Sequence, residues 1–315
     1  MKARRGGSRA APTEMRSSDT RSVAITHPEK VLFPGDDGIT KGELAAYYEW
    51  IAPIMLPHIR GRPVTMERYP AGIGKKGFWQ KDVTKAFPEW LKRVTVPKKD
   101  GTVHHPIVDD AASLLWTANQ NTITHHVWTS RVPDLYRPDV VVFDLDPSTD
   151  DEPDVLRQVA LAVRYFLGEL GLASLVKTTG SKGFHIVVPI DGNAKDAKKG
   201  DAARFADAVG TLLVKHDPQH LTQEFHKVDR GGRVLMDTGR NHYSATFAAA
   251  YTVRAKPGAP VSAPCTWDEV ERGTVTPKSF TIRNMAARIK KVGDLWADAK
   301  PSALQPAIER FRRLR

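Results

Sequence analysis

Apolar side chains first recur at intervals of three and four residues just after residue 40, and this period predicts a helix there. Thr40 precedes the run and Glu43 follows three residues later, which is the spacing of a capping box at a helix N-terminus. The same period predicts further helices over 109–119, 153–170, 201–216 and 302–313. Gly171 comes directly after one of them and is a typical residue beyond a helix C-terminus.

Short alternating or wholly apolar runs between the helices predict strands. The runs cover 63–69, 94–96, 103–107, 122–128, 140–143, 175–178, 184–190 and 233–236. Asp100-Gly101 separates the second run from the third, and this dipeptide predicts a tight hairpin turn. Residues 140–143 are apolar throughout, as expected of a strand buried on both faces. This mixed order predicts an α+β fold in which mixed or antiparallel sheets are flanked by helices.

The pattern divides the chain into four segments. Residues 1–22 are rich in Gly, Ser, Ala and Arg without apolar periodicity, so we expect a disordered basic tail there. Residues 23–130 form an N-terminal α/β module, and residues 131–290 form a second module that carries the candidate chemistry. Residues 291–315 form a basic helical segment.

The composition is that of a soluble globular protein, because 41% of the 315 residues are hydrophobic and 26% are charged. The most apolar stretch, residues 51–59, is much shorter than the roughly 20 residues of a membrane-spanning helix, which argues against a membrane protein. Cys265 is the only cysteine, so neither an internal disulfide nor a cysteine-based zinc site can form. We therefore expect a reducing, cytoplasmic location.

The net charge of +11 points to a polyanionic partner such as nucleic acid, with a merely basic enzyme as the alternative. Most of that excess lies at the two ends of the chain. Residues 1–21 carry a net +4 and residues 288–315 a net +5, so the 266 residues between them carry only +2. Charge thus predicts salt-sensitive DNA affinity from the termini but does not locate a site.

Two motifs match known signatures but fail in their context. Residues 72–77 read G-x-G-x-x-G, yet residues 78–82 lack the helical apolar spacing that must follow a dinucleotide-binding turn. Residues 98–101 read K-x-D-G, the nucleophilic lysine motif of DNA ligases, but they lie at the tip of the predicted hairpin. A lysine there has no apolar pocket to lower its pKa. We reject both interpretations.

The segment Val140–Pro147 carries the strongest chemical signal, because its buried run ends in Asp144 and Asp146. Residues two apart on a strand project from the same face, so the two carboxylates point the same way. Such a pair repels unless a cation lies between its members, and hard divalent ions prefer carboxylate oxygens. An isolated pair of this kind is more often a solvated acidic strand end. Two further segments favour the metal-binding interpretation.

The first is Lys177–His185, where two predicted strands flank a Thr-Gly-Ser-Lys-Gly turn. Its glycines would let backbone N–H groups approach phosphate oxygens, and Lys182 adds a positive charge. His185 could donate to a phosphate or ribose oxygen. The second segment is Val234–Asp237, whose aspartate would complete a two-metal site for phosphoryl transfer. Two arginines that could clamp a triphosphate follow, Arg240 and Arg254.

In order and approximate spacing these segments resemble the archaeo-eukaryotic primase superfamily. They look most like the polymerase domain of bacterial DNA ligase D and its stand-alone relatives. The N-terminal half agrees through short motifs at 26–34, 40–41, 47–48, 62–63 and 78–81. The resemblance covers roughly residues 23–290 and implies a two-module primase–polymerase core.

The resemblance also implies a role for each matching residue. Catalysis and metal binding fall on Asp144, Asp146 and Asp237. Nucleotide contacts fall on His126, Thr179, Lys182 and Arg254, beside the candidates His185 and Arg240. DNA contacts fall on Lys30, Lys41, Phe78, Trp79 and Lys81. The two lysines nearest the N-terminus would bind a 5′-phosphate across a gap, and the aromatic pair would meet the template, where stacking tolerates any base.

The implied activity is a nucleotidyltransferase that extends a DNA 3′ end with NTP or dNTP, using Mn²⁺ or Mg²⁺ in a two-metal site. It would fill short gaps in DNA repair, including non-homologous end joining. The implied partners are gapped or broken duplex DNA with a 5′-phosphate, nucleoside triphosphates, Ku and a separate DNA ligase, and the implied state is a monomer without membrane contact. Two alternatives stay open: a de novo primase, which needs a site for an initiating nucleotide, and a non-catalytic module that binds DNA gaps or ends.

Three departures from the ligase D pattern stand out. Thr124 stands where that pattern has glutamate, Arg240 where it has glutamine, and Asp-Thr-Gly-Arg-Asn replaces Asp-Trp-Ser-Gln-Asn. The predicted hairpin near residue 100 is also short, in a region that manages the template end during break synapsis in ligase D domains. These departures indicate a divergent stand-alone branch and argue against full end-joining behaviour.

Overall fold

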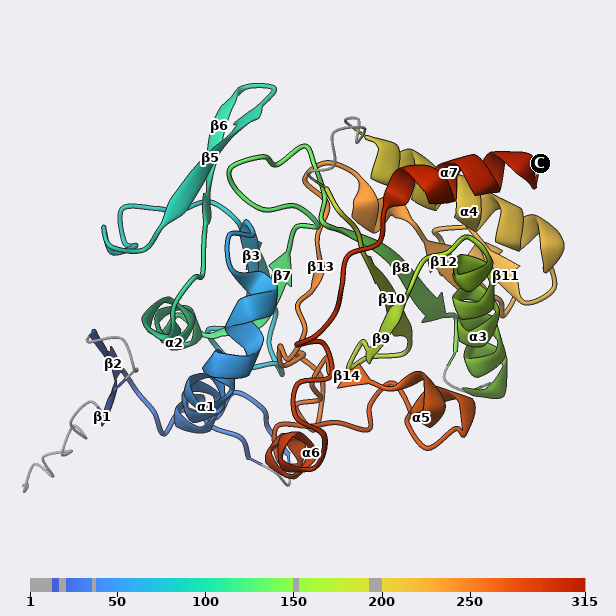
Figure 1. Ribbon diagram of the computed structural model, residues 1–315. Helices are drawn as coiled ribbons and strands as arrows, with labels where there is room; N and C mark the ends of the chain where they lie inside the picture. Colours follow the sequence, from blue (N-terminus) through green and yellow to red (C-terminus); the bar gives the residue numbers. More distant parts are fainter. Residues whose placement is uncertain (1–12, 17–20, 36–37, 150–152, 193–199, 315) are drawn as a thin grey trace, which may run out of the picture.

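A computed structural model describes residues 13–16, 21–35, 38–149, 153–192 and 200–314 (Figure 1). Helices, antiparallel strands and a mixed sheet occur together in this part of the chain, which confirms the predicted α+β class. The helices are α1 (Lys41–Ile59), α2 (Ala111–Asn119), α3 (Pro153–Glu169), α4 (Asp201–His216), α5 (Trp267–Glu271), α6 (Met285–Val292) and α7 (Leu304–Arg313). None of the helices in the described ranges combines the length and the apolar character needed to cross a membrane.

The larger sheet has the strand order β11–β12–β8–β10–β9–β14. Its strands are β8 (Val140–Pro147), β9 (Leu175–Thr178), β10 (Phe184–Pro189), β11 (Leu221–Thr222), β12 (Val234–Asp237) and β14 (Pro264–Cys265). Neighbours are antiparallel except β11 and β12, which are parallel. Helices α3 and α4 pack against this sheet, and Phe311 of α7 contacts Phe166 of α3 and Phe205 of α4 (Figure 1). Strand β8 is mostly buried, as its apolar sequence predicts.

A smaller sheet has the strand order β13–β7–β3–β4. Its strands are β3 (Val64–Arg68), β4 (Phe78–Gln80), β7 (Thr122–Val127) and β13 (Phe247–Ala248). Helices α1 and α2 pack against each other beside it (Figure 1). Helix α1 begins at the predicted capping box: the Thr40 hydroxyl accepts from the Glu43 N–H at 3.2 Å, and the Glu43 carboxylate accepts from the Thr40 N–H at 2.8 Å.

Two strand pairs lie outside these sheets. Strands β5 (Arg93–Lys98) and β6 (Gly101–Pro106) pair around the predicted Asp-Gly turn and project from the molecule (Figure 1). Strand β1 (Thr13–Arg16) pairs with β2 (Ser22–Ile25), so part of the segment that we expected to be disordered is a strand. The edge of β2 offers it hydrogen-bonding partners, which composition alone cannot reveal. Residues 1–12 of the predicted tail lie outside the described residues.

Residues from the second half of the chain complete the N-terminal sheet. Strand β13 pairs with β7, although more than a hundred residues separate them in sequence. The Tyr47 hydroxyl donates to the Tyr251 carbonyl at 2.8 Å, and the Tyr48 hydroxyl lies 3.0 Å from that of Thr252. One cluster of buried apolar side chains spans both sheets. The module boundary near residue 130 stays a prediction, and residues 247–252 pack with the N-terminal half.

Several short elements differ from those predicted. Strand β4 forms where residues 78–82 show no clear pattern, because it is a partly exposed edge strand held by β3. The pattern did not predict helices α5 and α6, and α6 begins at Met285, ahead of the helical segment expected from residue 291. Helices of five and eight residues contain too few turns for an apolar period to be visible.

Candidate active site

Four polar side chains lie in one row across the larger sheet. Asp237 of β12 is opposite Asp144 of β8. On the other side of β8, Asp144 is opposite His185 of β10, and His185 is in turn opposite Lys177 of β9. Directly opposed residues project from the same face of a sheet, so the strand register alone brings these groups together.

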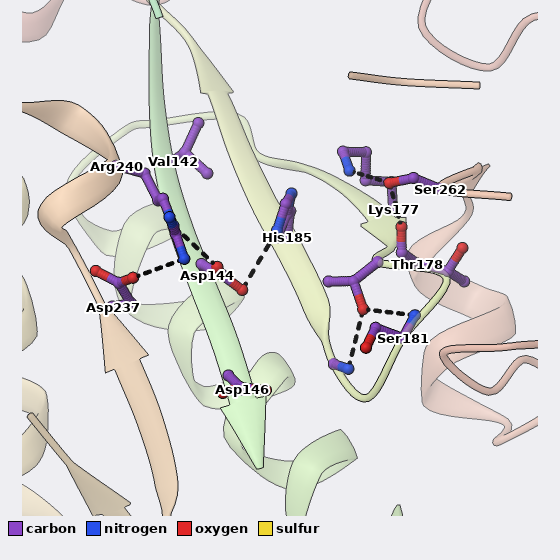
Figure 2. A network of polar contacts seen from close by, with 12 residues as sticks. Val142, Asp144, Asp146, Lys177, Thr178, Ser181, His185, Asp237, Arg240 and Ser262 are labelled. Carbon is purple, nitrogen blue, oxygen red and sulfur yellow. Dashed lines mark hydrogen bonds and ion pairs between the residues drawn. The ribbon is translucent and has the colours of Figure 1, made fainter. Parts of the chain in front are cut away.

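Arg240 joins the two aspartates of this row (Figure 2). Its Nε is 3.1 Å from Asp144 Oδ2 and its Nη2 is 3.0 Å from Asp237 Oδ2. The other oxygen of Asp144 lies 3.3 Å from His185 Nε2. Both oxygens of Asp144 therefore have partners, a guanidinium on one side and an imidazole on the other.

Asp146 lies nearer the end of β8, apart from this pair (Figure 2). Its Oδ2 is 3.0 Å from Nη1 of Arg230, a side chain that is only 4% exposed. Arg230 also donates to the carbonyls of Glu224 and Phe225, at 3.1 and 2.8 Å. Within the described ranges, no group of three or more His, Cys, Asp or Glu side chains is arranged to hold a metal ion. All three aspartates instead contact arginines, Asp144 and Asp237 through Arg240 and Asp146 through Arg230.

Burial and charge set the ionisation of this row. Burial alone would raise the pKa of Asp144, but His185 and Arg240 outweigh it and hold the pKa below its ordinary value. Burial raises the pKa of Asp237, although Arg240 opposes the shift. Burial and the charge of Lys177 lower the pKa of His185 to about 4. A neutral imidazole carries one N–H, and the contact to Asp144 places it on Nε2.

Several N–H groups of the turn between β9 and β10 form hydrogen bonds within the protein. The Thr179 hydroxyl accepts from the N–H groups of Ser181 and Gly183, both at 3.1 Å, and Gly180 N donates to the Pro277 carbonyl at 3.0 Å. The N–H groups of these two glycines are thus engaged within the protein, and the predicted approach of backbone N–H groups in this turn to a phosphate stays a prediction. The glycines also serve close packing: a Cβ on Gly183 would lie 1.6 Å from the carbonyl oxygen of Leu145.

Arg254 fixes one wall of the cleft. Its Nη1 donates to the Thr179 carbonyl at 2.7 Å. Its Nε is buried and has no hydrogen-bond partner among the described residues. A buried, unpartnered donor on a guanidinium is costly unless an anionic ligand satisfies it. Arg254 thus remains well placed for the predicted contact to a triphosphate.

The opposite wall comes from the smaller sheet. His126 of β7 packs against Trp79 of β4, with 4.4 Å between ring centroids and the rings tilted by 53°. The Oε2 of Glu67 on β3 lies 3.3 Å from His126 Nε2. Phe78 is next to Trp79 on the strand and so points to the other face, where Arg68 lies over its ring. The two aromatic residues predicted to act as a pair therefore face different ways.

Together these walls enclose a cleft of about 370 Å³, which we call the metal-side cleft after the three candidate metal-binding aspartates in its lining. The predicted residues that line it are Trp79, His126, Asp144, Asp146, Thr179, His185, Asp237, Arg240 and Arg254. Lys182 lines a neighbouring cleft on the far side of the turn, with Arg157 and Lys278. Phe78 and Lys81 do not line the metal-side cleft.

The remaining predicted DNA contacts lie at the start of α1. Lys41 is the first residue of the helix, and its backbone N–H donates to the Lys30 carbonyl at 2.8 Å. Its ammonium donates to the carbonyl and hydroxyl oxygens of Thr26, at 2.7 and 3.1 Å. Burial and the charge of Lys30 lower the pKa of Lys41 to about 8. The structure brings the two lysines together, with Lys30 exposed and Lys41 buried.

Residues 40–296 match the model of the LigD primase-polymerase domain. The chain belongs to this LigD primase-polymerase family. The resemblance seen in the sequence is confirmed, as is the enzyme class, a metal-dependent nucleotidyltransferase of the polymerase type. The roles of individual residues stay predictions.

Similar proteins and a similar solved structure support this family assignment. The polymerase domain of Mycobacterium tuberculosis ligase D in complex with DNA is 34% identical, with a TM-score of 0.80 over 88% of this chain and 99% of that chain. The multifunctional non-homologous end joining protein LigD of Mycolicibacterium smegmatis is 35% identical over 277 residues, and the M. tuberculosis LigD is 34% identical over 310 residues. These matches cover 87% and 96% of this chain but only 36% and 40% of the two relatives.

The structure accounts for one departure from the LigD pattern. Thr124, where the pattern has glutamate, lies opposite Glu67 on the neighbouring strand β3. A carboxylate is therefore still present beside His126, although it comes from another strand. Sequence reasoning did not assign a role to Glu67, Arg230 or Lys177. No local motif surrounds the first two, and Lys177 only begins the segment that carries the turn. All three are charged residues within or beside an apolar strand. Which residues they contact depends on the strand register, which the sequence does not show.

Proposed function

We propose that this domain adds nucleotides to a DNA 3′ end in gapped or broken duplex DNA, as a step of DNA repair. The observation that carries the proposal is the cleft in which the aspartates of β8 and β12 face His126 and Arg254. The names of the relatives support a role in end joining, and the structural relative is in complex with DNA.

The three aspartates fit divalent metal ions by the chemistry of their donor atoms. Asp144 and Asp146 offer hard carboxylate oxygens from one face of β8, and Asp237 offers them from the next strand. Mg²⁺ and Mn²⁺ both prefer such oxygens, so we propose that these residues hold two ions of either kind. When bound, the ions would stabilise charge on the α-phosphate and activate the 3′-hydroxyl. Arg240 and Arg230 must first release the carboxylates.

Side chains, rather than backbone amides, would bind the triphosphate. Arg254 lines the cleft, donates to the Thr179 carbonyl, and keeps a buried Nε without a partner among the described residues. Arg240 can add a second guanidinium, and Lys182 can approach from the far side of the turn. Thr179 acts by closing that turn. His185 acts on Asp144, which it holds in place, in contrast to the direct nucleotide contact predicted from the sequence.

DNA would cross the smaller sheet and the start of α1. Lys30 and Lys41 lie together at the N-terminus of a 19-residue helix, where a 5′-phosphate is favoured by both charge and dipole. Trp79 is 58% exposed at the cleft and can stack on a base, while Phe78 and Lys81 face outward beside it. Lys41 must exchange its bonds to Thr26 for the phosphate.

We also propose the setting in which this reaction occurs. The domain would act as a monomer in the cytoplasm, on DNA of the nucleoid. In end joining, Ku would hold the broken ends and a separate ligase would seal the filled nick. The end-joining role in the names of the relatives supports proposing these two partners.

Primer extension across a short gap tests the proposal. We expect metal-dependent addition to the 3′ end, faster when the downstream strand carries a 5′-phosphate, and comparison of NTP with dNTP and of Mn²⁺ with Mg²⁺ identifies the substrates. Synthesis without a primer would favour the de novo primase instead. Tight binding to gapped DNA with no incorporation under any of these conditions would contradict the proposal and favour a non-catalytic module.

A further inference from the structure

The guanidinium of Arg240 occupies the space between the carboxylates of Asp144 and Asp237 (Figure 2). It contacts Oδ2 of both residues, at 3.1 and 3.0 Å. A divalent ion held by these two aspartates would need carboxylate oxygens that Arg240 now engages. An internal cation and an external one therefore compete for the same ligands.

The backbone beside Arg240 is firmly held, whereas its side chain is not. Arg240 lies in the short helix η2 (Gly239–Asn241). The side-chain amide of Asn241 accepts from Val142 N and donates to Val142 O, at 2.7 and 2.6 Å. The Arg240 side chain is 39% exposed, and its further contact, to the Thr246 carbonyl, is long at 3.5 Å. The guanidinium can leave the aspartates while the strand end stays in place.

The Arg230 side chain, in contrast to that of Arg240, is firmly held. Its side chain is 4% exposed and donates to the carbonyls of Glu224 and Phe225 as well as to Asp146. It is anchored by backbone groups that remain when Asp146 is withdrawn. Of the two arginines on the aspartates, Arg240 is the one whose main partners are the carboxylates themselves.

The Arg240 guanidinium could also bind a second anionic group in the same cleft. Arg254 and Thr179 line that cleft together with it, so a triphosphate bound there lies within the reach of Arg240. A guanidinium binds phosphate oxygens as well as it binds carboxylates. An incoming triphosphate thus offers Arg240 new anionic partners when metal ions take the old ones.

We propose that Arg240 is a displaceable counterion of the metal site. In the nucleotide-free protein it neutralises Asp144 and Asp237 and weakens the binding of divalent ions. When metal and nucleotide arrive together, it transfers to the triphosphate. Metal binding and nucleotide binding are therefore coupled through one side chain. The inference rests on the proposed function, because it assumes that this cleft takes a nucleoside triphosphate.

Titration with Mn²⁺ alone, without nucleotide or DNA, tests the proposal, with free Mn²⁺ measured by electron paramagnetic resonance. Arg240→Met removes the charge, keeps the length and adds no oxygen ligand. Because two charge-assisted hydrogen bonds no longer compete, we expect Mn²⁺ to bind about tenfold tighter or more than to the unchanged protein. Arg240→Lys, whose single ammonium makes fewer contacts, should fall between the two.

The control is Arg233→Met. Among the described residues, the Arg233 side chain donates to the carbonyls of Arg230 and Asp229 and to no carboxylate of the site. It therefore tests the loss of a positive charge without the loss of a competing group. We expect little change in Mn²⁺ affinity for this variant. Equal affinities for Arg240→Met and the unchanged protein would overturn the proposal, and so would an equal gain in the Arg233 control. If Arg240→Met does not fold, an Arg240→Lys affinity no tighter than that of the unchanged protein overturns it.

A second titration measures the coupling itself. A non-reactive nucleoside triphosphate analogue should strengthen Mn²⁺ binding more in the unchanged protein than in Arg240→Met, because only the former has a competing group to displace. Equal strengthening would overturn the transfer of Arg240 to the triphosphate. Neither titration uses DNA or turnover, so failure of primer extension refutes the proposed function separately from this inference.

Discussion

Glu67 and His126 meet across neighbouring strands β3 and β7, with 3.3 Å between Oε2 and Nε2. The other carboxylate oxygen of Glu67 accepts from the Tyr69 hydroxyl at 2.8 Å. Trp79 packs on the other side of the imidazole. The carboxylate and the indole together hold His126 at the mouth of the metal-side cleft.

This contact predicts a loss of stability in acid. Burial lowers the pKa of His126 to about 4, and hydrogen bonds from His126 and Tyr69 outweigh burial and lower the pKa of Glu67 to about 2. Each unfolded group binds its proton at a higher pH than the folded one. Stability should therefore fall as the pH drops from about 6.5 to 4 for His126, and from about 4.5 to 2 for Glu67.

Urea unfolding of Glu67→Gln separates the contribution of Glu67 to the pH dependence of stability from that of His126. At pH 7 we expect the variant to be about 1–3 kcal/mol less stable, because it loses a charged hydrogen-bond acceptor. Below pH 4.5 the difference should shrink, since Glu67 becomes protonated in the unfolded state while it stays ionised in the folded state down to about pH 2. Glu29→Gln is the control, because the Glu29 side chain is 64% exposed. A difference that stays constant down to pH 3 would contradict the assigned role of Glu67.

The lysine pair predicts how the protein senses a 5′-phosphate. Lys30→Ala should abolish the gain in gap filling that a downstream 5′-phosphate gives, while extension of an open primer continues. Lys215→Ala, on the exposed end of α4, should leave that gain unchanged. Retention of the full phosphate effect in Lys30→Ala would show that the phosphate binds elsewhere.

The same site predicts a pH dependence of phosphate binding. Burial and Lys30 lower the pKa of Lys41 to about 8, so the ammonium loses its proton as the pH rises through this value. Affinity for gapped DNA with a 5′-phosphate should therefore weaken between pH 7 and pH 9, relative to the same DNA without the phosphate. Fluorescence anisotropy of the two DNAs measures the ratio. A ratio independent of pH would argue against a role for Lys41.

Arg230 predicts a large effect on stability. Arg230→Ala removes a buried guanidinium and leaves the Asp146 carboxylate and three backbone carbonyls, those of Asp146, Glu224 and Phe225, without their donor. We expect a loss of about 2–4 kcal/mol in the free energy of unfolding, as for other broken buried pairs. Arg233→Ala, which affects only two other carbonyls, should cost clearly less. Equal losses in urea unfolding would show that Arg230 is not an anchor.

Most of the fold could be predicted from the sequence where local rules act. The capping box at Thr40, the Asp-Gly hairpin and the apolar strand β8 all form as their residues predict. The strand-end aspartates follow from such strands and could be named as candidates. Short elements such as β4 and α5 could not, because their pairing partners rather than their own periods determine them.

The contacts within the site could not be predicted from the sequence. Strand register aligns Asp237, Asp144 and His185, and register depends on pairing between distant segments. The same holds for Glu67 beside His126 and for Arg230 beside Asp146. The glycines of the β9–β10 turn show the converse: their positions were evident, but whether their N–H groups are engaged depends on the surrounding protein.

Nucleotide addition by Asp146→Ala tests the central claim most directly. Asp146 is 37% exposed at the edge of the cleft, and Asp146→Asn, which keeps the shape of the side chain, provides a second variant if the loss of the Arg230 contact affects folding. The account predicts that both variants bind gapped DNA about as well as the unchanged protein but add no detectable nucleotide to a primer, with either Mn²⁺ or Mg²⁺. Extension near the unchanged rate would contradict it.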